Sequence, residues 1–271
     1  MVRGEGESES GIAIVAALWA AAILAIMTLS VMQIVRADAR VGRGRGDVAE
    51  LSAVADAGVN IAILSLLSPR ASQPPVNGVP FTIPFAGYSV RVSVQDEAGK
   101  IDLNMVNAAT LRALLADAGM ETGPAIDVAN KILALRGVTP DGQGARAPSG
   151  QRLQSVEALQ SVPGITAEVY RRMAPLVTVY SQTSWIDPAF SNLGVLNVYR
   201  TIDPNAQTAW LRKEEERAGL RPADPSPGVA LGHAFTVVAE VTGTAGARAV
   251  RTATIRLTGQ KQQPLLIYAW N

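Results

Sequence analysis

The sequence lacks cysteine, has one histidine and carries almost no net charge. Without cysteine, a disulfide scaffold, a thiolate metal site, an iron–sulfur cluster and a cysteine nucleophile are all excluded. Lys and Arg total 24 against 23 Asp and Glu, so the chain has no overall basic field for nucleic acid. His233 has no H-E-x-x-H or G-x-S-x-G pattern beside it, and the sequence contains no glycine-rich phosphate loop. We therefore predict that the protein is not an enzyme and that His233 is structural.

What is present instead is a long uncharged stretch near the N-terminus, Ile12–Val35. As a helix it would be about 36 Å long, and the hydrocarbon core of a bilayer is about 30 Å thick. The apolar region of a signal peptide is usually only about 7–15 residues, and no small-residue cleavage site follows this stretch. We predict a transmembrane helix over residues 12–35, preceded by a short segment, residues 1–11.

Arginines follow this helix and conflict with one possible orientation. The segment before it has one arginine, and the segment after it has four: Arg36, Arg40, Arg43 and Arg45. By positive charge alone, the C-terminal side would lie in the cytoplasm.

The helical pattern continues to Ser68, where Pro69 ends it. The three glycines of Gly42–Gly46 cost a helix about 1 kcal/mol each relative to alanine, so we predict a weak point or a kink there.

The remaining sequence predicts an α+β fold, because strand patterns and helix patterns occupy separate parts of the chain. Tyr88–Gln95 alternates between valines and polar residues, as a half-buried strand does. Three further strands are predicted, with short turns that favour an antiparallel meander: Ala234–Val241, Ala247–Thr258 and Pro264–Trp270. Pro74–Pro84 is interpreted as a turn region.

Helical patterns lie between the first strand and the last three. The predicted helices are Ala108–Asp117, Pro124–Arg136, Ser155–Ser161, Thr166–Ala174 and a polar surface helix, Pro204–Ala218. Asn107 can cap the first of them. Residues 36–103 and 221–271 are accordingly assigned to an α+β domain, and residues 104–220 to a helical insertion.

Two segments suggest binding chemistry. Asp96–Asn104 is rich in oxygen ligands of the kind that calcium prefers, but it departs from EF-hand spacing, and we favour a turn with polar caps. Val162–Ile165 resembles the hairpin of a helix-hairpin-helix module, with a degenerate copy around Gly119. In DNA-binding modules such a hairpin holds a phosphate. Acidic and basic residues nearly balance across the insertion, and Glu121 would repel phosphate, so DNA binding is the weaker alternative.

Three segments together resemble the minor pseudopilin GspK family of type II secretion systems. Ser10-Gly11-Ile12-Ala13 is similar to a prepilin peptidase site, which is cut after the glycine. Asp96–Asn104 resembles the transition into the family's helical insertion, and Val156–Tyr180 resembles the return from it. The ending Leu266–Trp270 is similar to the family's last strand.

The resemblance implies a pilin-like fold with a long N-terminal helix and an antiparallel sheet, and a structural function at the pseudopilus tip. It implies a leader over residues 1–11, processing between Gly11 and Ile12, and an inner-membrane protein with its globular part in the periplasm. Ala16 takes the fifth mature position, where most pilin-like subunits have glutamate, and this absence is itself similar to the K subunit. The implied partners are other minor pseudopilins, the major pseudopilin and prepilin peptidase, without nucleic acid. Some members of the family bind calcium.

The apolar helix would also be the assembly surface. Small side chains let helices approach closely in a membrane, and this helix is rich in alanine. The residues predicted for this surface are Ala13, Ala16, Ala17, Trp19 and Ala20. A membrane-anchored DNA receptor that uses the hairpin remains the alternative function.

Overall fold

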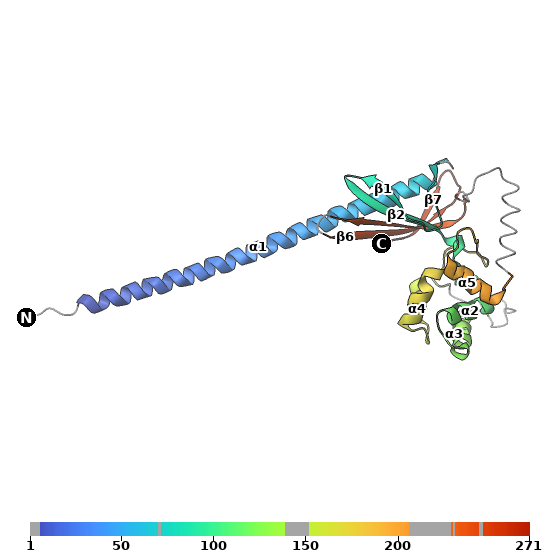
Figure 1. Ribbon diagram of the computed structural model, residues 1–271, viewed down its shortest axis with the longest axis horizontal. Helices are drawn as coiled ribbons and strands as arrows, with labels where there is room; N and C mark the ends of the chain where they lie inside the picture. The colour runs from blue at the N-terminus through green and yellow to red at the C-terminus, as the bar shows by residue number, and fades with distance from the viewer. Residues whose placement is uncertain (1–5, 70–71, 139–151, 206–228, 230, 244–245) are drawn as a thin grey trace, which may run out of the picture.

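A computed structural model describes residues 6–69, 72–138, 152–205, 229, 231–243 and 246–271. Its longest element is the helix α1, Gly6–Leu66, which has 61 residues. Figure 1 shows α1 extending away from the globular part, with only its C-terminal portion lying on the sheet. The N-terminus therefore lies at one end of the molecule, and the small helices of the insertion lie near the other end.

The helix α1 is continuous through Gly42–Gly46, so a kink there is wrong, and a weak point stays a prediction. Glycine weakens a helix without removing a backbone hydrogen-bond donor, unlike proline. The long flanking segments supply enough helical hydrogen bonds to carry the helix across the glycines. The predicted end is close to the observed one, because α1 ends at Leu66 and Pro69 follows.

A five-stranded antiparallel sheet with the order β1-β2-β5-β6-β7 forms the body of the molecule. Its strands are β1 (Phe81–Phe85), β2 (Tyr88–Asp96), β5 (Ala234–Thr242), β6 (Arg248–Leu257) and β7 (Leu265–Trp270). The antiparallel meander of the last three strands is as predicted. Strand β1 was not predicted, because its Pro84 indicated a turn. As an edge strand, β1 tolerates proline, which lacks a donor for a further strand.

The first hydrophobic core lies between α1 and this sheet. Apolar residues of α1 recur at helical spacing on the face that meets the strands: Leu51, Val54, Ala55, Val59, Ala62 and Leu66. Gly58 allows the closest approach, since a Cβ atom there would lie 2.6 Å from Val90 Cγ1. Side chains also join the two layers, because Trp270 Nε1 donates to Asp56 Oδ1 at 3.0 Å and Tyr88 donates to Glu50 at 2.9 Å.

The insertion has a second core of its own. Its elements are η2 (Glu97–Gly99), β3 (Ile101–Asp102), α2 (Ala108–Asp117), α3 (Thr122–Leu135), η3 (Val156–Ser161), α4 (Ala167–Met173), η4 (Ala174–Leu176), β4 (Val177–Thr178) and α5 (Leu193–Ile202). Strands β3 and β4 pair in parallel, so the segments that lead into and out of the helices lie side by side. Leu111, Leu114, Ile132 and Leu133 are fully or almost fully buried at the centre of this core.

The helix predictions for the insertion are largely confirmed. Asn107 caps α2 as predicted, with Asn107 Oδ1 accepting from Thr110 N at 2.9 Å. The segment Val156–Ser161 is a 3₁₀-helix and not an α-helix, because its i→i+3 bonds suit a short connecting turn. Helix α5 was not predicted, although Asn192 caps its first turn. Most of the predicted helix Pro204–Ala218 lies outside the described residues.

Candidate functional site

The apolar portion of α1 lies away from both cores, and its side chains are exposed. Every described side chain in Val15–Leu29 is exposed, including Ala16, Ala17, Trp19 and Ala20, and Trp19 is 68% exposed. A water-soluble monomer rarely exposes an apolar surface of this extent, so other apolar groups must cover it. Gly11, Ile12 and Ala13 lie in the same helix, and their side chains are outside the description.

Among the described residues, one helical segment is long and apolar enough to cross a membrane by length and composition, Gly46–Leu66. That segment packs on the sheet and belongs to the first core. Val15–Leu29 is a shorter apolar segment by the same criterion, and its described side chains are exposed. The exposed segment near the N-terminus is therefore the better candidate for an anchor.

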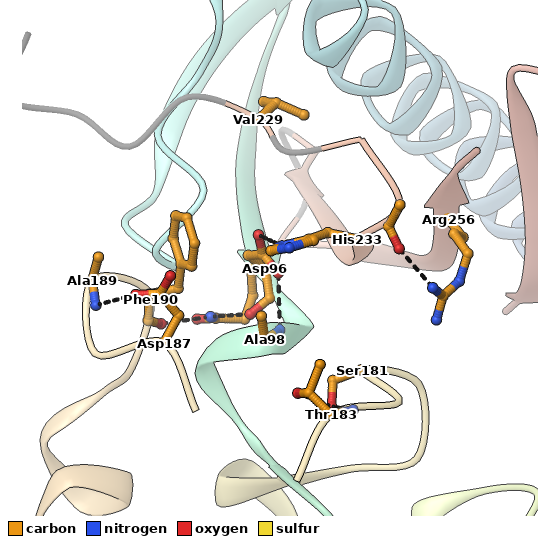
Figure 2. A network of polar contacts seen from close by, with 12 residues as sticks. Asp96, Ala98, Ser181, Thr183, Asp187, Ala189, Phe190, Val229, His233 and Arg256 are labelled. Atoms are coloured by element: carbon orange, nitrogen blue, oxygen red, sulfur yellow. Dashed lines mark hydrogen bonds and ion pairs between the residues drawn. The ribbon is translucent and has the colours of Figure 1, made fainter. Parts of the chain in front are cut away.

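The junction between the sheet and the insertion is a polar network (Figure 2). Asp96 is the last residue of β2, and its side chain is completely buried. Asp96 Oδ1 accepts from Ala98 N at 2.9 Å, which caps η2 and turns the chain into the insertion. Asp96 Oδ2 lies 2.8 Å from His233 Nδ1, on the residue that precedes β5.

Two effects oppose each other at this pair. Burial raises the pKa of the Asp96 carboxyl, and the hydrogen bond from His233 lowers it without cancelling the effect of burial. The hydrogen bond to Asp96 raises the pKa of His233, against burial and the nearby Arg256, which lower it. The prediction that His233 is structural agrees with its position, since it binds the carboxylate that shapes the junction.

Arg256 joins the two parts of the molecule from β6. Its Nη2 donates to Tyr180 O at 2.6 Å, and Tyr180 follows β4 of the insertion. Its Nη1 donates to Gly232 O at 2.6 Å, and its Nε donates to the Tyr268 hydroxyl at 2.7 Å. The rings of Tyr180 and Tyr268 stack with centroids 5.2 Å apart. One side chain therefore holds the insertion, the start of β5 and the last strand together.

A second contact at the junction involves Phe190, in the segment before α5. Gln95 Nε2 donates to Phe190 O at 2.8 Å, and Asp187 N donates to Ala98 O at 2.8 Å. Gly99 packs against the same carbonyl, where a Cβ atom would lie 2.2 Å from Phe190 O. The junction is thus tightly packed, and Gly99 is required there for space.

Asp102 holds the two connecting segments of the insertion together. It is 1% exposed, and burial raises the pKa of its carboxyl. Its Oδ1 accepts from Asn104 N at 2.8 Å, and its Oδ2 accepts from Gln182 N at 2.7 Å and Ser181 Oγ at 3.1 Å. The acidic residues of the segment Asp96–Asn104 thus serve as polar caps and bridges.

These bonds bear on the possible calcium site. Glu97 adds an ion pair to Lys100 at 2.8 Å, so the three carboxylates of the segment have partners within the protein. Within the part of the chain that the structure describes, no group of three or more His, Asp or Glu side chains could hold a metal ion. No step of the function is assigned to calcium.

The two hairpins of the insertion have a reciprocal arrangement. Gly164 has φ +105° and Gly119 has φ +92°, values that glycine adopts readily. Lys131 of α3 donates from Nζ to Pro163 O of the second hairpin at 3.0 Å. Arg172 of α4 donates to Ala118 O beside the first hairpin at 3.5 Å. Each helix following a hairpin thus contacts the other hairpin.

This arrangement engages basic groups that a DNA-binding module would use for phosphate. Glu168 pairs with Arg171 and, at 2.9 Å, with Arg172, which lowers the pKa of its carboxyl. A phosphate at the start of α4 would meet this carboxylate. Nothing among the described residues favours the DNA-binding alternative.

Several residues of the junction were not anticipated from the sequence. Arg256, Gln95 and Phe190 contact partners far away in the chain, and no local spacing relates them. Asp96 lies within a segment that the sequence did single out, but its pairing with His233 had no sequence signal. The sequence distinguishes His233 as its single histidine, but it does not indicate which residue His233 contacts.

Comparison with known proteins agrees with this architecture. Residues 93–182 match the family described as type II secretion system (T2SS), protein K. No curated protein matches the chain by sequence. A chain of the crystal structure of the GspK-GspI-GspJ complex from the enterotoxigenic Escherichia coli type 2 secretion system has a similar fold, with a TM-score of 0.57. The two chains are 16% identical, and the match covers 86% of this chain and 98% of that one.

Proposed function

We infer that the chain belongs to the protein K family of type II secretion systems and is a minor pseudopilin. The single observation that carries this inference is the family match over residues 93–182, which extends from the end of β2 through the insertion to the segment after β4. The sequence resemblance pointed to the same family from three separate segments. The fold adds independent support, because a long α1 lies on an antiparallel sheet that carries an all-α insertion.

The proposed role is structural, at the tip of the pseudopilus. The exposed side chains of Val15–Leu29 would lie in the inner membrane before assembly. In the filament the same side chains would pack against the equivalent helices of other subunits, driven by burial of apolar surface. The globular part would then lie in the periplasm.

The position of the insertion supports a capping role. It lies near the end of the molecule farther from the N-terminus (Figure 1). If N-terminal helices run along the filament axis, this end points away from the membrane, and the insertion would obstruct a subunit stacking above. Other minor pseudopilins are the proposed partners below, since the structurally similar chain comes from a complex named for three Gsp proteins. The major pseudopilin would follow lower in the filament.

Processing by prepilin peptidase is the most direct test. Mass spectrometry of the protein isolated from membranes of a peptidase-containing host should detect an N-terminus at Ile12. The variant Gly11→Val should keep residues 1–11, and Gly4→Val, which changes a glycine away from the cleavage site, should be processed normally. An intact N-terminus on the wild-type chain, or a cut after the apolar segment, would contradict the pseudopilin assignment.

The tip position requires a separate measurement. Gold-labelled antibody against the globular part should mark one end of assembled pseudopili, and the chain should co-purify with other minor pseudopilins. Regular labelling along the whole filament would contradict the capping role while leaving the family assignment intact.

A further inference from the structure

The insertion leaves the sheet and returns to it at one place. Asp96 ends β2, and His233 immediately precedes β5. These two strands are neighbours, and Asp96 is the register partner of Phe235. The contact between Asp96 and His233 therefore joins the last residue of β2 to the residue that precedes β5, where the chain leaves the sheet and returns to it (Figure 2).

We propose that Asp96 and His233 form a pH-sensitive clasp, which holds the insertion against the sheet when His233 is protonated and loosens when His233 is neutral. The proposal concerns an internal contact of this chain and does not depend on its assembly into a filament. It assigns a function to the only histidine in the sequence.

The other hydrogen bonds described across the junction involve groups that do not change charge near neutral pH. The guanidinium of Arg256 keeps its charge at all physiological pH values. The contacts of Gln95 with Phe190 O and of Asp187 N with Ala98 O involve amide donors and carbonyl acceptors. His233 is the side chain here whose charge changes between about pH 5 and 8.

The surroundings of His233 favour its charged form. Asp96 contacts it from β2, and Asp187 adds a second negative charge from the segment before α5. Arg256 on β6 opposes these carboxylates, but its guanidinium is engaged by Gly232 O and Tyr180 O. Two aromatic rings lie near the ring of His233, Phe190 edge-on with centroids 6.4 Å apart and Phe235 stacked at 6.5 Å. Its ring is therefore held in place while its charge can change.

Loss of the proton weakens the contact because Asp96 is completely buried. The hydrogen bond keeps one charged partner when His233 is neutral, but the Coulombic attraction between two opposite charges, which is strong in a low-dielectric site, is lost. When His233 is neutral, the buried carboxylate loses its counter-charge, which is unfavourable in a low-dielectric site. Movement of the junction would bring water to Asp96 and relieve this cost, so the junction loosens at higher pH while the contacts of Arg256 and Gln95 remain.

The pH range over which the clasp holds follows from the pKa of His233, which is raised in the folded protein. The clasp is fully formed below the ordinary histidine value of about 6.5 and is lost as pH rises through the higher value of the folded protein. Burial raises the pKa of Asp96, so protonation of this carboxyl sets the acid limit of the window.

Two measurements on the full chain in detergent test the clasp. Because there is one histidine, its imidazole resonance can be followed by NMR without assignment ambiguity, and its midpoint should lie above about 6.5. Hydrogen exchange at the Asp187 amide should report opening. Its protection, corrected for intrinsic exchange, should fall by up to about tenfold per pH unit between the open-state and closed-state pKa values.

The variant His233→Asn is the matched control, because asparagine keeps an N–H donor without a titratable charge. Its protection at Asp187 should be independent of pH and close to that of the wild-type chain at high pH. A cysteine pair, Ser89→Cys on β2 and Ala116→Cys on α2, allows a spin-label distance measurement in this cysteine-free chain. The distance distribution should broaden as pH rises.

A histidine midpoint at or below about 6.5 would overturn the clasp. The clasp would also be contradicted if protection at Asp187 and the spin-label distances in the wild-type chain did not change with pH. A pH dependence of the protection at Asp187 that persists in His233→Asn would contradict it as well. If His233→Asn does not fold, the wild-type resonance and distance measurements still decide the question.

Discussion

Substitution of Gly99 by alanine tests whether the junction is as tightly packed as its geometry indicates. Gly99 is buried at the end of η2, and its backbone does not have the positive φ that penalises side chains. A Cβ atom would lie 2.2 Å from Phe190 O and 2.4 Å from Phe190 C, and both are backbone atoms. The backbone of one segment must therefore move by about 1 Å to restore ordinary contact distances.

The expected cost combines three effects. Forced overpacking costs about 1–3 kcal/mol. Displacement of Phe190 O also weakens the hydrogen bond from Gln95 Nε2, which is worth about 0.5–1.5 kcal/mol. Alanine restricts the unfolded chain more than glycine and returns about 0.4–1 kcal/mol. We expect a net loss of about 1–4 kcal/mol in the free energy of unfolding.

Thermal unfolding of the full chain in detergent, followed by circular dichroism, should show this loss. For a chain of this size, about 1 kcal/mol corresponds to about 2–4 °C, so Gly99→Ala should lower the Tm by about 2–16 °C. Gly123→Ala is the matched control, because Gly123 lies in α3 with nothing within 4 Å of the added Cβ. It should leave the Tm unchanged or raise it. Equal Tm values for Gly99→Ala and the wild-type chain would refute the packing argument.

Two further substitutions test the insertion itself. Leu114→Ala removes a fully buried side chain and should lower the free energy of unfolding in urea by about 2–5 kcal/mol. The control Leu135→Ala changes an exposed side chain and should lower it by under about 0.5 kcal/mol. Similar losses for both variants would contradict the second core. Gly164 has φ +105°, and a Cβ atom there would lie 2.7 Å from Val128 Cγ2. Gly164→Ala should therefore destabilise the protein by about 1–3 kcal/mol and increase hydrogen exchange at the second hairpin. Unchanged exchange would indicate that this hairpin is not packed on α3.

The sequence allowed most regular elements to be predicted because their signals are local. The alternation in Tyr88–Gln95 and the cap at Asn107 each involve residues a few positions apart, and β2 and α2 lie where they were expected. The proline of β1 gave a misleading local signal, because only the position at the sheet edge makes it tolerable. Helix α5 was not predicted, although its signals are local too: a cap at Asn192 and the buried residues Val195 and Val198 at helical spacing.

The junction could not be predicted in the same way. Asp96 and His233 are separated by the whole insertion, and their contact exists only because β2 and β5 are neighbours in the sheet. The contact of Arg256 with Tyr180 O likewise depends on where two separately folded cores meet. Packing at Gly99 depends on the backbone of a segment that no sequence pattern relates to it.

The neighbouring positions of β2 and β5 also have a consequence for the order of folding. Closing a loop as long as the insertion carries an entropic cost, and contacts between distant segments slow folding. If the insertion collapses first around its own core, β3 and β4 already bring its two connecting segments side by side. The pairing of β2 with β5 would then resemble the closure of a short hairpin, so nascent structure in the insertion would accelerate formation of the sheet.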